Sequence, residues 1–590
     1  MNRNTQSHFA NIPSMDISRS KFDRSFNHTT TGDLGELIPV YVDPDIVPGD
    51  SVFMKMSDLI RMTTPVCPTM GDLKADFYWF FVPNRLVWDN FKKFWGENDT
   101  APWIQTTQYQ IPQVTIKNDQ AVGNDLCNTV IKGSVLDHMG IPTQNKWKLA
   151  GSGSPAEPAR EISISALPAR AYCLIWNEFF RSEALQNPVQ VPKTDTTVST
   201  RNKNWAAYAT DPDAYQVSYG YRGGLPCLKT CKTFDYFTAG LPSPQAGNDV
   251  TLPMNGDAPI KSKAFEMEYN GTNYWYGGNS PDIYSKCVSS NTYDFGTKPV
   301  ATGAGSPTPL EGGYDITFGF TGQMSGRLVA DLSQATGATI NQLRTAFAIQ
   351  KWQEREARGG QRYIESVLSH YRVQNPDYRL QRPEYLGGYT HAIQVNQVLN
   401  NTDGTGAAPL GTTGAYSLSV HQNGDVFSHS FTEHGILMCL MTIRQSQHVY
   451  QQGINRAWFK KDRVDFYTPE FANLGETYIT EDEIYATGIA ADDKSAFAYQ
   501  ERWAEMRYMP DMVSCSMRSD YSGSLDVWHY ADNYSSAPSL GNKWIQETDA
   551  NLKRTLAVQN EDQFKIDLYF GATYTRPLPM WSVPGLLDHH

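Results

Sequence analysis

The chain has little charge and no long hydrophobic run. Of its 590 residues, 19% are charged and 40% are hydrophobic, and both shares lie below typical globular usage. The longest apolar run, Gly435 to Ile443, is too short to span a bilayer, so no membrane insertion is expected. The formal net charge of −12 argues against a protein that coats nucleic acid through an overall basic surface.

Cysteine is also scarce, with eight residues in the whole chain. The first sixteen residues, MNRNTQSHFANIPSMD, have no apolar core and no cleavage site, so we expect no secretory signal. Without export, the cysteines are expected to be free thiols in a reducing cytosol. Cys227 and Cys231 form a lone CxxxC without a second pair, which does not favour zinc.

Sequence motifs for catalysis are missing as well. The chain contains no GxSxG, P-loop, GxGxxG or HExxH motif. His421, His429, His434 and His448 are separated by 8, 5 and 14 residues, not by the three or four of helical zinc sites. We therefore predict no catalytic, cofactor or metal site, and no enzyme.

Aromatic residues, by contrast, are plentiful. They make up 12% of the chain, with 32 Tyr and 14 Trp, and their rings can supply a large buried area. Disorder of the whole chain is therefore not expected. Together with 45 Gly and 34 Pro, this composition favours short strands joined by long, ordered, polar loops.

Strand patterns occur near both ends of the chain. Apolar residues alternate at period two in three stretches, namely Val52, Met54 and Met56; Leu73, Ala75, Phe77, Trp79 and Phe81; and Phe564, Ile566, Leu568 and Phe570. We predict that these first and last strands belong to one sheet system, with long excursions between them. That organisation is typical of a jelly roll with insertions.

Helix patterns are fewer. Residues 339–388 predict two helices interrupted at Gly359-Gly360, and the segment carries eight Lys or Arg against five Asp or Glu. We interpret it as a helical hub from which the loops of a β framework depart. Residues 166–181 predict another helix. The run from Gly435 to Ile443 is apolar on both faces, and periodicity cannot distinguish a buried strand from a short buried helix there.

Two segments differ from the rest. Residues 1–33 are polar, and their cations are Arg3, Arg19, Lys21 and Arg24. We interpret this segment as an arm on the protein surface; the alternative is an arm that lies on a partner subunit or on nucleic acid. Residues 241–340 hold 14 Gly and few patterned runs, as is usual for a surface excursion. The aromatic residues Tyr274, Trp275 and Tyr276 favour a folded cap there.

Several long motifs have a familiar form. They are GELIPVYVDPDIVPGDSVFMKM, PTMGDLKADFYWFFVPNRLVWDNFKKFWGEN, LKTCKTFDYFTAGLPSPQ, IQKWQEREARGGQRYIESVLSHY, RLQRPEYLGG, YQQGINRAWFKKDRVDFYTPEFANLGE, ERWAEMRYMP and RPLPMWSVPGLLDHH. In this order the chain closely resembles the major capsid proteins of gokushoviruses, small single-stranded DNA bacteriophages of the family Microviridae. The resemblance has a gap at roughly 246–335, and the family's LPWPQ stands here as Leu241-Pro242-Ser243-Pro244-Gln245.

The resemblance implies a mainly β fold, an eight-stranded antiparallel jelly roll (a β-sandwich) with long loop insertions and a few α-helices. It implies self-assembly into a T=1 icosahedral shell around a circular single-stranded DNA genome, in the virion, after assembly in the bacterial cytoplasm. Its implied partners are copies of the chain, a small basic internal DNA-binding protein, a minor DNA-pilot protein and a host surface receptor. The expected parts are an arm (1–33), a first part of the body (34–245), a threefold protrusion (246–335), and a hub with the remaining body (336–590).

Candidate contact residues follow from residue type. Cationic grooves and aromatic faces hold single-stranded DNA, and Lys460, Lys461 and Arg463 follow Trp458 and Phe459, although packing is the more common role of such rings. Arg3, Arg19, Lys21 and Arg24 are further candidates. Tyr274, Trp275 and Tyr276 are candidates for host-surface contact, and a structural knob is the competing interpretation. A carbohydrate-binding or carbohydrate-active β-sandwich is the alternative function.

Overall fold

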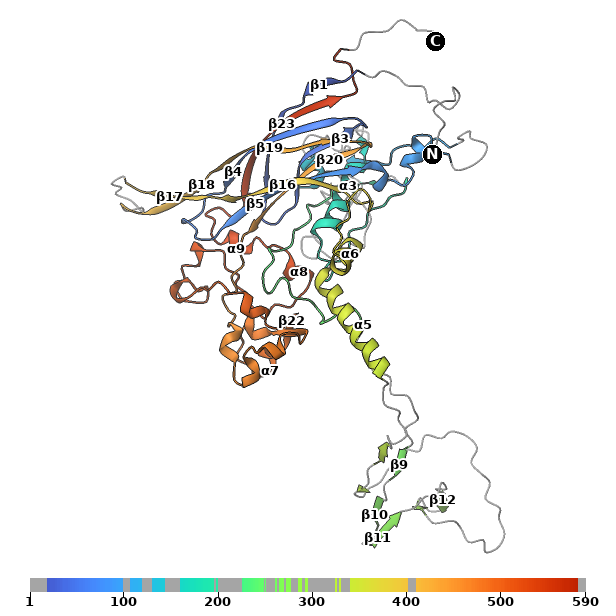
Figure 1. Ribbon diagram of the computed structural model, residues 1–590. Helices are drawn as coiled ribbons and strands as arrows, with labels where there is room; N and C mark the ends of the chain where they lie inside the picture. The colour runs from blue at the N-terminus through green and yellow to red at the C-terminus, as the bar shows by residue number, and fades with distance from the viewer. Residues whose placement is uncertain are drawn as a thin grey trace, which may run out of the picture. The chain divides into compact units, whose positions relative to one another are not determined.

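The computed structural model describes residues 18–98, 107–118, 130–143, 160–195, 225–248, 340–401 and 410–581, together with Val250 and the backbone of short strands between 198 and 330 (Figure 1). The fold is mainly β, with antiparallel sheets and few helices, as the sequence predicted. The chain divides into two compact units, residues 1–247 with 353–590, and residues 248–352.

Two antiparallel sheets form the body of the first unit. One has the order β2-β23-β4-β19, and β1 pairs with β23 beside β2. The other has the order β16-β5-β20-β3. The strands are β1 Ser20–Asp23, β2 Phe26–Gly32, β3 Ile38–Ile46, β4 Ser51–Met62, β5 Leu73–Pro83, β16 Glu384–Ile393, β19 Ser419–Ser430, β20 Gly435–Gln445 and β23 Phe564–Arg576.

The period-two stretches form strands where the sequence predicted them. In β4 and β23 every second side chain is buried, because one face of each strand lies on the core. Twelve residue pairs join β23 to β4, from Phe564 opposite Met62 to Thr575 opposite Ser51. The prediction that the first and last strands share a sheet system is therefore confirmed.

The two sheets share one apolar core. Trp79 of β5, Tyr41 of β3 and Phe570 of β23 are buried against one another, with ring centroids 5.1 to 5.9 Å apart. Edge-on and tilted aromatic pairs of this kind contribute about 0.5–1.5 kcal/mol each beyond the area they bury. Side chains of both sheets thus close the space between them, as in a β-sandwich.

A second core covers the outer face of the sheet β16-β5-β20-β3. Phe80 and Val82 of β5 and Met438 of β20 pack there against α3, which supplies Tyr172 among others. α3 and the loops beside it therefore exclude solvent from this outer face. The predicted helix at 166–181 appears as α3, Leu167–Ile175, continued by a π-helical turn at Trp176–Phe180. The run from Gly435 to Ile443 is a strand, because both of its faces are covered.

The segment from residue 446 to 563 has little regular structure. It contains the two-stranded sheet of β21, Glu476–Thr480, and β22, Ala496–Glu501, and several single 3-10 turns. A third apolar cluster holds it against residues 236–237, through Tyr450, Ile479 and Trp544. The remaining elements of this segment are α7 Ala490–Asp493, α8 Asn542–Ile545 and α9 Ala550–Lys553.

Further elements lie in the connections of the first unit. They are α1 Phe91–Phe94, α2 Val135–His138, β6 Gln113–Asn118, β7 Arg160–Ser165, β8 Val198–Ser199, β17 Val395–Leu399 and β18 Thr413–Ser417. The two predicted helices of the 339–388 segment are α5, Ile340–Gly359, and α6, Tyr363–Tyr371, separated at Gly360. Among the residues that the structure describes, no helix has the length and apolarity needed to cross a bilayer.

The second unit contains short antiparallel strands and the first part of α5. The strands are β9 Ile260–Ser262, β10 Phe265–Tyr269, β11 Thr272–Tyr276, β12 Ser285–Val288, β13 Thr292–Phe295, β14 Met324–Ser325 and β15 Leu328–Ala330. β10 lies between β11 and β14, and β12 pairs with β13.

Candidate functional site

The basic residues predicted near the N-terminus have different surroundings. Arg3 lies outside the described residues, and Arg19 and Lys21 are exposed. Arg24 Nη1 lies 2.5 Å from Asp43 Oδ2, and its guanidinium stands over the Tyr574 ring at 4.7 Å. Arg24 is therefore held by its own chain, whereas Arg19 and Lys21 face solvent.

Lys460 and Lys461 lie between two short 3-10 turns, Arg456–Phe459 and Arg463–Asp465, and Arg463 begins the second turn. Lys461 and Arg463 are exposed, and Lys460 Nζ lies 5.1 Å from the centroid of the Phe466 ring. The neighbouring Trp458 side chain is 83% exposed. The structure thus places three cations beside the partly exposed rings of Trp458 and Phe466. Proteins that bind single-stranded nucleic acid combine cations for the phosphates with aromatic rings on which the bases stack.

Two acidic side chains, Asp465 and Asp482, stabilise the backbone around residues 459–465. The Asp465 carboxylate accepts hydrogen bonds from the backbone N–H groups of Lys461 and Asp462, which lower the pKa of Asp465. Lys494 Nζ lies over the Phe459 ring at 4.2 Å and binds the Asp482 carboxylate at 2.6 Å. These contacts fix the backbone that carries Lys461 and Arg463, while both side chains stay exposed.

Tyr274, Trp275 and Tyr276 lie on β11, which pairs with β10 so that Trp275 is opposite Glu266. Their side chains lie outside the described residues. The structure therefore establishes an antiparallel hairpin backbone here.

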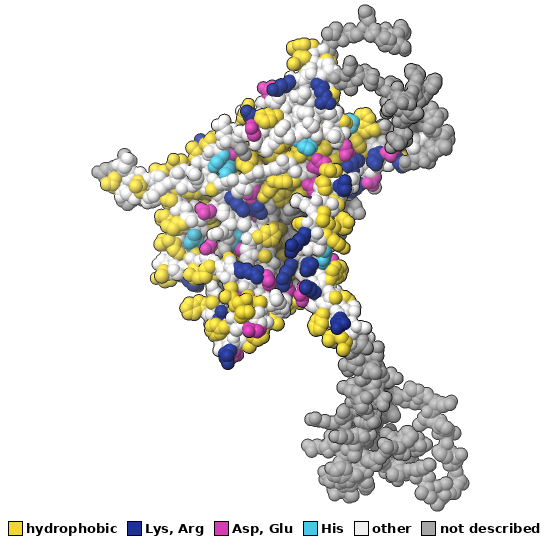
Figure 2. Space-filling view, viewed as in Figure 1, with side chains coloured by type: hydrophobic (Ala, Val, Ile, Leu, Met, Phe, Trp, Pro, Cys, Tyr) yellow, Lys and Arg dark blue, Asp and Glu magenta, His cyan; other side chains and the backbone are white. Residues whose placement is uncertain are grey.

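Large apolar side chains are exposed along the segment that carries β22 and α7 (Figure 2). Between residues 454 and 525 the exposed ones are Ile454, Trp458, Val464, Phe466, Tyr467, Leu474, Tyr478, Ile489, Met506, Met509, Met512, Tyr521 and Leu525. We call this set the 454–525 apolar surface. On α6 the side chains of Tyr363, Leu368 and Tyr371 are exposed too. Exposed apolar side chains that gather in one region often mark interaction surfaces in soluble proteins.

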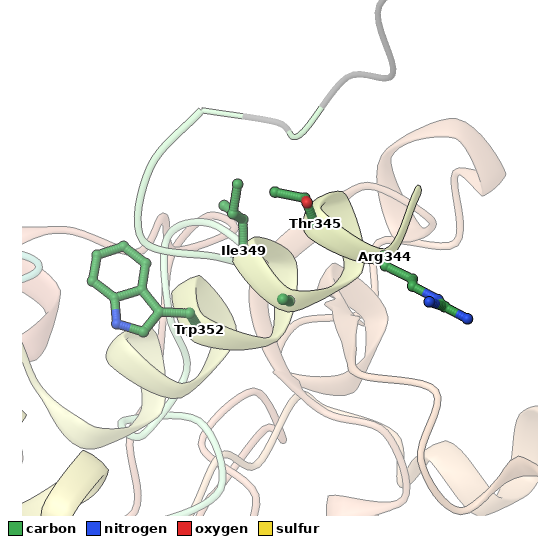
Figure 3. Close-up of a pocket in the computed structure, with 5 residues that line it drawn as sticks. Arg344, Thr345, Ile349 and Trp352 are labelled. Carbon is green, nitrogen blue, oxygen red and sulfur yellow. The ribbon is translucent and has the colours of Figure 1, made fainter. Parts of the chain in front are cut away.

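α5 carries a further open hollow of about 410 Å³. It is lined by Arg344, Thr345, Ala348, Ile349 and Trp352, on successive turns of the helix (Figure 3). In Figure 3 Thr345 and Ile349 stand one turn apart, as residues four positions apart on a helix do. The lining offers one cation and no acid–base pair, so it has the character of a contact face.

A buried ionic cluster joins the 446–563 segment to Lys232. His448 lies between Asp532 and Glu547, with Nδ1 3.5 Å from the Asp532 carboxylate and Nε2 3.2 Å from that of Glu547. Burial alone would lower the pKa of His448, but the two carboxylates outweigh it and raise the pKa to about 9. The Asp532 carboxylate also binds Lys232 Nζ, and its pKa lies well below the usual range. All four side chains are closed to solvent, so the cluster is structural.

Asp58, His391 and His421 form a second polar cluster, at the edge of the sandwich. One ligand atom from each lies within 4.8 Å of the other two. Burial raises the pKa of Asp58 to about 7, lowers that of His391 to about 4, and lowers that of His421. The histidine spacing in the sequence did not identify this group, because its members come from three strands. Their one sequence signal is Asp58 itself, an acid in the inward row of β4.

The cysteines provide no comparable site in the part of the chain described. Cys67, Cys173, Cys227, Cys231, Cys439 and Cys515 are all free. Burial raises the pKa of the Cys231 thiol to about 11 and raises that of the Cys227 thiol well above its usual value. The CxxxC pair therefore consists of two protonated thiols, of which Cys227 is buried and Cys231 is half-buried.

A β body that exposes apolar side chains over long irregular segments is built to associate with other molecules. Comparison with known proteins identifies the class of protein to which the chain belongs. Residues 10–586 match the family model described as capsid protein (F protein). Capsid protein VP1 of Bdellovibrio phage phiMH2K is 37% identical over 588 residues, which cover 99% of this chain and 98% of the relative.

Two further relatives agree. Capsid protein VP1 of Chlamydia phage 1 is 33% identical over 620 residues, with 98% of this chain and 97% of the relative covered. Capsid protein VP1 of Spiroplasma virus 4 is 32% identical over 582 residues, with 97% and 96% covered. The chain belongs to the F/VP1 capsid proteins of the Microviridae, structural and non-enzymatic components of the virion. The resemblance seen in the sequence is thereby confirmed, and the carbohydrate-active alternative is left without support.

Proposed function

We propose that copies of this chain close into a T=1 icosahedral shell around a circular single-stranded DNA genome, as its major capsid protein. The 454–525 apolar surface is the observation that carries the proposal. Three of its members, Met506, Met509 and Met512, are 58 to 78% exposed within seven residues, and apolar area of this kind is costly to leave in water. Methionine adapts readily to the shape of a partner.

A closed shell needs each subunit to present unlike, complementary patches to its neighbours. A rigid sandwich with long segments leaving it supplies such patches without enlarging the core. The exposed face of α6, with Tyr363 and Tyr371, offers a second patch. Aromatic residues and methionine are enriched in interfaces, which fits the composition of both surfaces.

The eight strands of the body are those of a jelly roll in this proposal. In chain order β2, β3, β4, β5, β16, β19, β20 and β23 would be its first to eighth strands. The sheet orders β2-β23-β4-β19 and β3-β20-β5-β16 then place the first beside the eighth and the second beside the seventh, as a jelly roll requires. The connection from β5 to β16 would carry the large insertion.

Assembly tests the proposal directly. We expect Met509→Glu/Met512→Glu to leave a folded chain that no longer sediments as a shell, because two charges then stand on the contact surface. Met509→Leu/Met512→Leu keeps the apolar area and is the matched control, which should assemble. Sedimentation velocity and negative-stain microscopy of the purified full-length protein give the readout. Normal shells from the glutamate variant would remove this surface from the proposal, and a wild-type chain that stays monomeric would overturn the shell itself.

We also propose that Lys460, Lys461 and Arg463, with Arg3, Arg19 and Lys21, contact the genome. The exposure of Lys461 and Arg463 beside Trp458 supports this assignment. Arg24 contributes less, because Asp43 already neutralises its charge. Because the chain has a net charge of −12, it cannot neutralise the DNA phosphates by itself, and a small basic internal protein would supply the missing positive charge. A minor DNA-pilot protein would be a further partner in the virion.

Host recognition is assigned to the insertion at 246–335, as an outward threefold protrusion with Tyr274, Trp275 and Tyr276 as contact residues. The division of the chain at residues 248–352 supports a separate part here. So does the β10–β11 hairpin, which gives the three aromatic positions an ordered backbone. The protrusion would contact a receptor on the bacterial surface.

A further inference from the structure

Asp58 is an acidic residue in an apolar row. Along β4 the inward side chains are Val52, Met54, Met56, Asp58, Ile60 and Met62, and all of them are buried. An isolated carboxylate is costly to bury in such a place unless it is paired or binds a cation. Tyr389 and His391 provide its hydrogen bonds, and the Tyr389 hydroxyl is 3.5 Å from Asp58 Oδ1.

Two imidazoles converge on this carboxylate. His391 Nε2 lies 2.9 Å from Asp58 Oδ2, and His421 Nδ1 lies 3.7 Å from the same oxygen. The two ring centroids are 3.7 Å apart. Ligands held at about 2.0–2.2 Å by one zinc ion stand roughly 3–4 Å apart. The two distances to Asp58 Oδ2 are close to that range, and all three ligand atoms lie within 4.8 Å of one another.

Two ring nitrogens of the Asp58, His391 and His421 cluster have no hydrogen-bond partner among the described residues. His421 Nδ1 is buried and, in the described part of the chain, has no hydrogen-bond partner. The same holds for Nδ1 of His391, whose side chain is only 8% exposed. Buried polar atoms are rarely left unpaired, and an ion between the side chains would give His421 Nδ1 a partner.

The fold places the cluster where the two sheets meet. β16 and β19 are the edge strands of their respective sheets, and β4 is the neighbour of β19, with Asp58 opposite His421 in the register. His391 comes from β16, whereas Asp58 and His421 come from the facing sheet. A ligand held by all three therefore links one sheet to the other at their open edge.

We propose that Asp58, His391 and His421 form a binding site for a divalent first-row transition metal ion, with Zn²⁺ as the best fit. Two imidazoles and one carboxylate are the donor set that such ions prefer, whereas Ca²⁺ and Mg²⁺ take oxygen ligands. The His421 side chain is 32% exposed although its Nδ1 is buried, so the cluster lies close to the protein surface. The Tyr389 hydroxyl holds the second carboxylate oxygen and orients Asp58. The bound ion would fasten the two sheets together.

Metal binding by the purified full-length protein tests the proposal. After treatment with EDTA and removal of the chelator, titration with Zn²⁺ should give one ion per chain and raise the thermal midpoint. Co²⁺ should bind the same site and show visible absorption of a nitrogen- and oxygen-ligated ion. His421→Ala should weaken Zn²⁺ binding by about tenfold or more and abolish the thermal shift.

The matched control is His429→Ala. His429 lies on the same strand, is similarly exposed, and stands 3.8 Å from a single carboxylate, Glu384. The His429→Ala variant should bind Zn²⁺ with the affinity of the wild type. Should His421→Ala not fold, His421→Gln keeps the side-chain size and serves in its place. A wild-type chain that takes up no Zn²⁺, or a His421 variant that binds one ion with unchanged affinity, would overturn the proposal.

Discussion

Lys232 and Asp532, 300 residues apart in the chain, form an ion pair of 3.1 Å in which both side chains are 2% exposed. The Lys232 ammonium also stands 4.8 Å from the centroid of the Trp544 ring. This pair joins the strand-poor segment at 446–563 to the segment that follows residue 225. It is one of several polar contacts that anchor that segment, together with the hydrogen bonds Tyr450–Asp235 and Tyr236–Glu483.

Removing one member of the pair should be costly. We expect Asp532→Asn to lower the free energy of unfolding by about 3–5 kcal/mol, because Lys232 would keep its charge in a buried site without its carboxylate partner. Urea unfolding of the full-length chain, followed by tryptophan fluorescence, measures the change. Lys565→Met is the control, since its pair with Glu561 is 56% exposed on both sides, and it should cost less than about 1 kcal/mol. Equal effects of the two substitutions would contradict this account.

Stability should fall as the pH rises from about 6.5 to 9. The pKa of His448 is about 9 in the folded chain, because Glu547 and Asp532 favour the imidazolium over the effect of burial. In the unfolded chain its pKa is about 6.5. The stabilisation is therefore complete below pH 6.5 and is lost as the pH rises through 9, about 3 kcal/mol in all. His448→Gln should flatten the profile in this window, measured by urea unfolding at each pH. A variant with the wild-type slope there would exclude His448 as the cause.

Gly388 has no room for a side chain. It lies on β16, where a methyl group would collide with the Phe77 carbonyl oxygen of β5 and with the Tyr385 hydroxyl. We expect Gly388→Ala to cost about 1–3 kcal/mol in thermal or urea unfolding. Gly414 on β18 has its nearest neighbouring atom, the Val398 oxygen, 3.9 Å from the same position, so Gly414→Ala should be almost neutral. The test is whether Gly388→Ala lowers the free energy of unfolding more than Gly414→Ala does. Equal losses would mean that β16 moves away from β5 at little cost.

Lys460, Lys461 and Arg463 should contribute to binding of single-stranded DNA through their charge. We expect the triple alanine variant to bind an oligonucleotide more weakly and to lower the slope of log affinity against log salt by about 2, since each lost phosphate contact contributes roughly 0.7. Fluorescence anisotropy across a salt series measures both. Lys132→Ala/Lys543→Ala/Lys565→Ala removes the same charge from other exposed positions and is the control. If both variants show the same salt slope, net charge and not this segment governs DNA binding.

The insertion should be needed for adsorption and not for assembly. Phage whose capsid chain lacks residues 246–335 should form shells that fail to adsorb, and Tyr274→Ala/Trp275→Ala/Tyr276→Ala should adsorb more slowly. Adsorption is counted as free phage remaining over time, and microscopy confirms that shells are present. Normal adsorption of the deletion variant rules out host recognition by this part.

Some features of this protein follow from the sequence alone. The alternation at Val52–Met56, Leu73–Phe81 and Phe564–Phe570 was sufficient to predict β4, β5 and β23, because successive side chains of a strand point to opposite faces. The helices at 340–371 followed from a 3.6-residue period and from Gly360 between them. The family followed from long motifs in a constant order. Each of these signals is contained in a short stretch of chain.

Other features depend on which distant stretches meet, and that is decided by the tertiary structure. Gly435 to Ile443 is a strand because β20 lies between β5 and β3 with a core on each face, which no local period reveals. Asp58 meets His391 and His421 only because two sheet edges come together, and Lys232 meets Asp532 only across 300 residues. Burial, pairing and convergence of charges are properties of neighbours in space. A linear pattern records the faces of one element, and the packing of the elements determines what those faces contact.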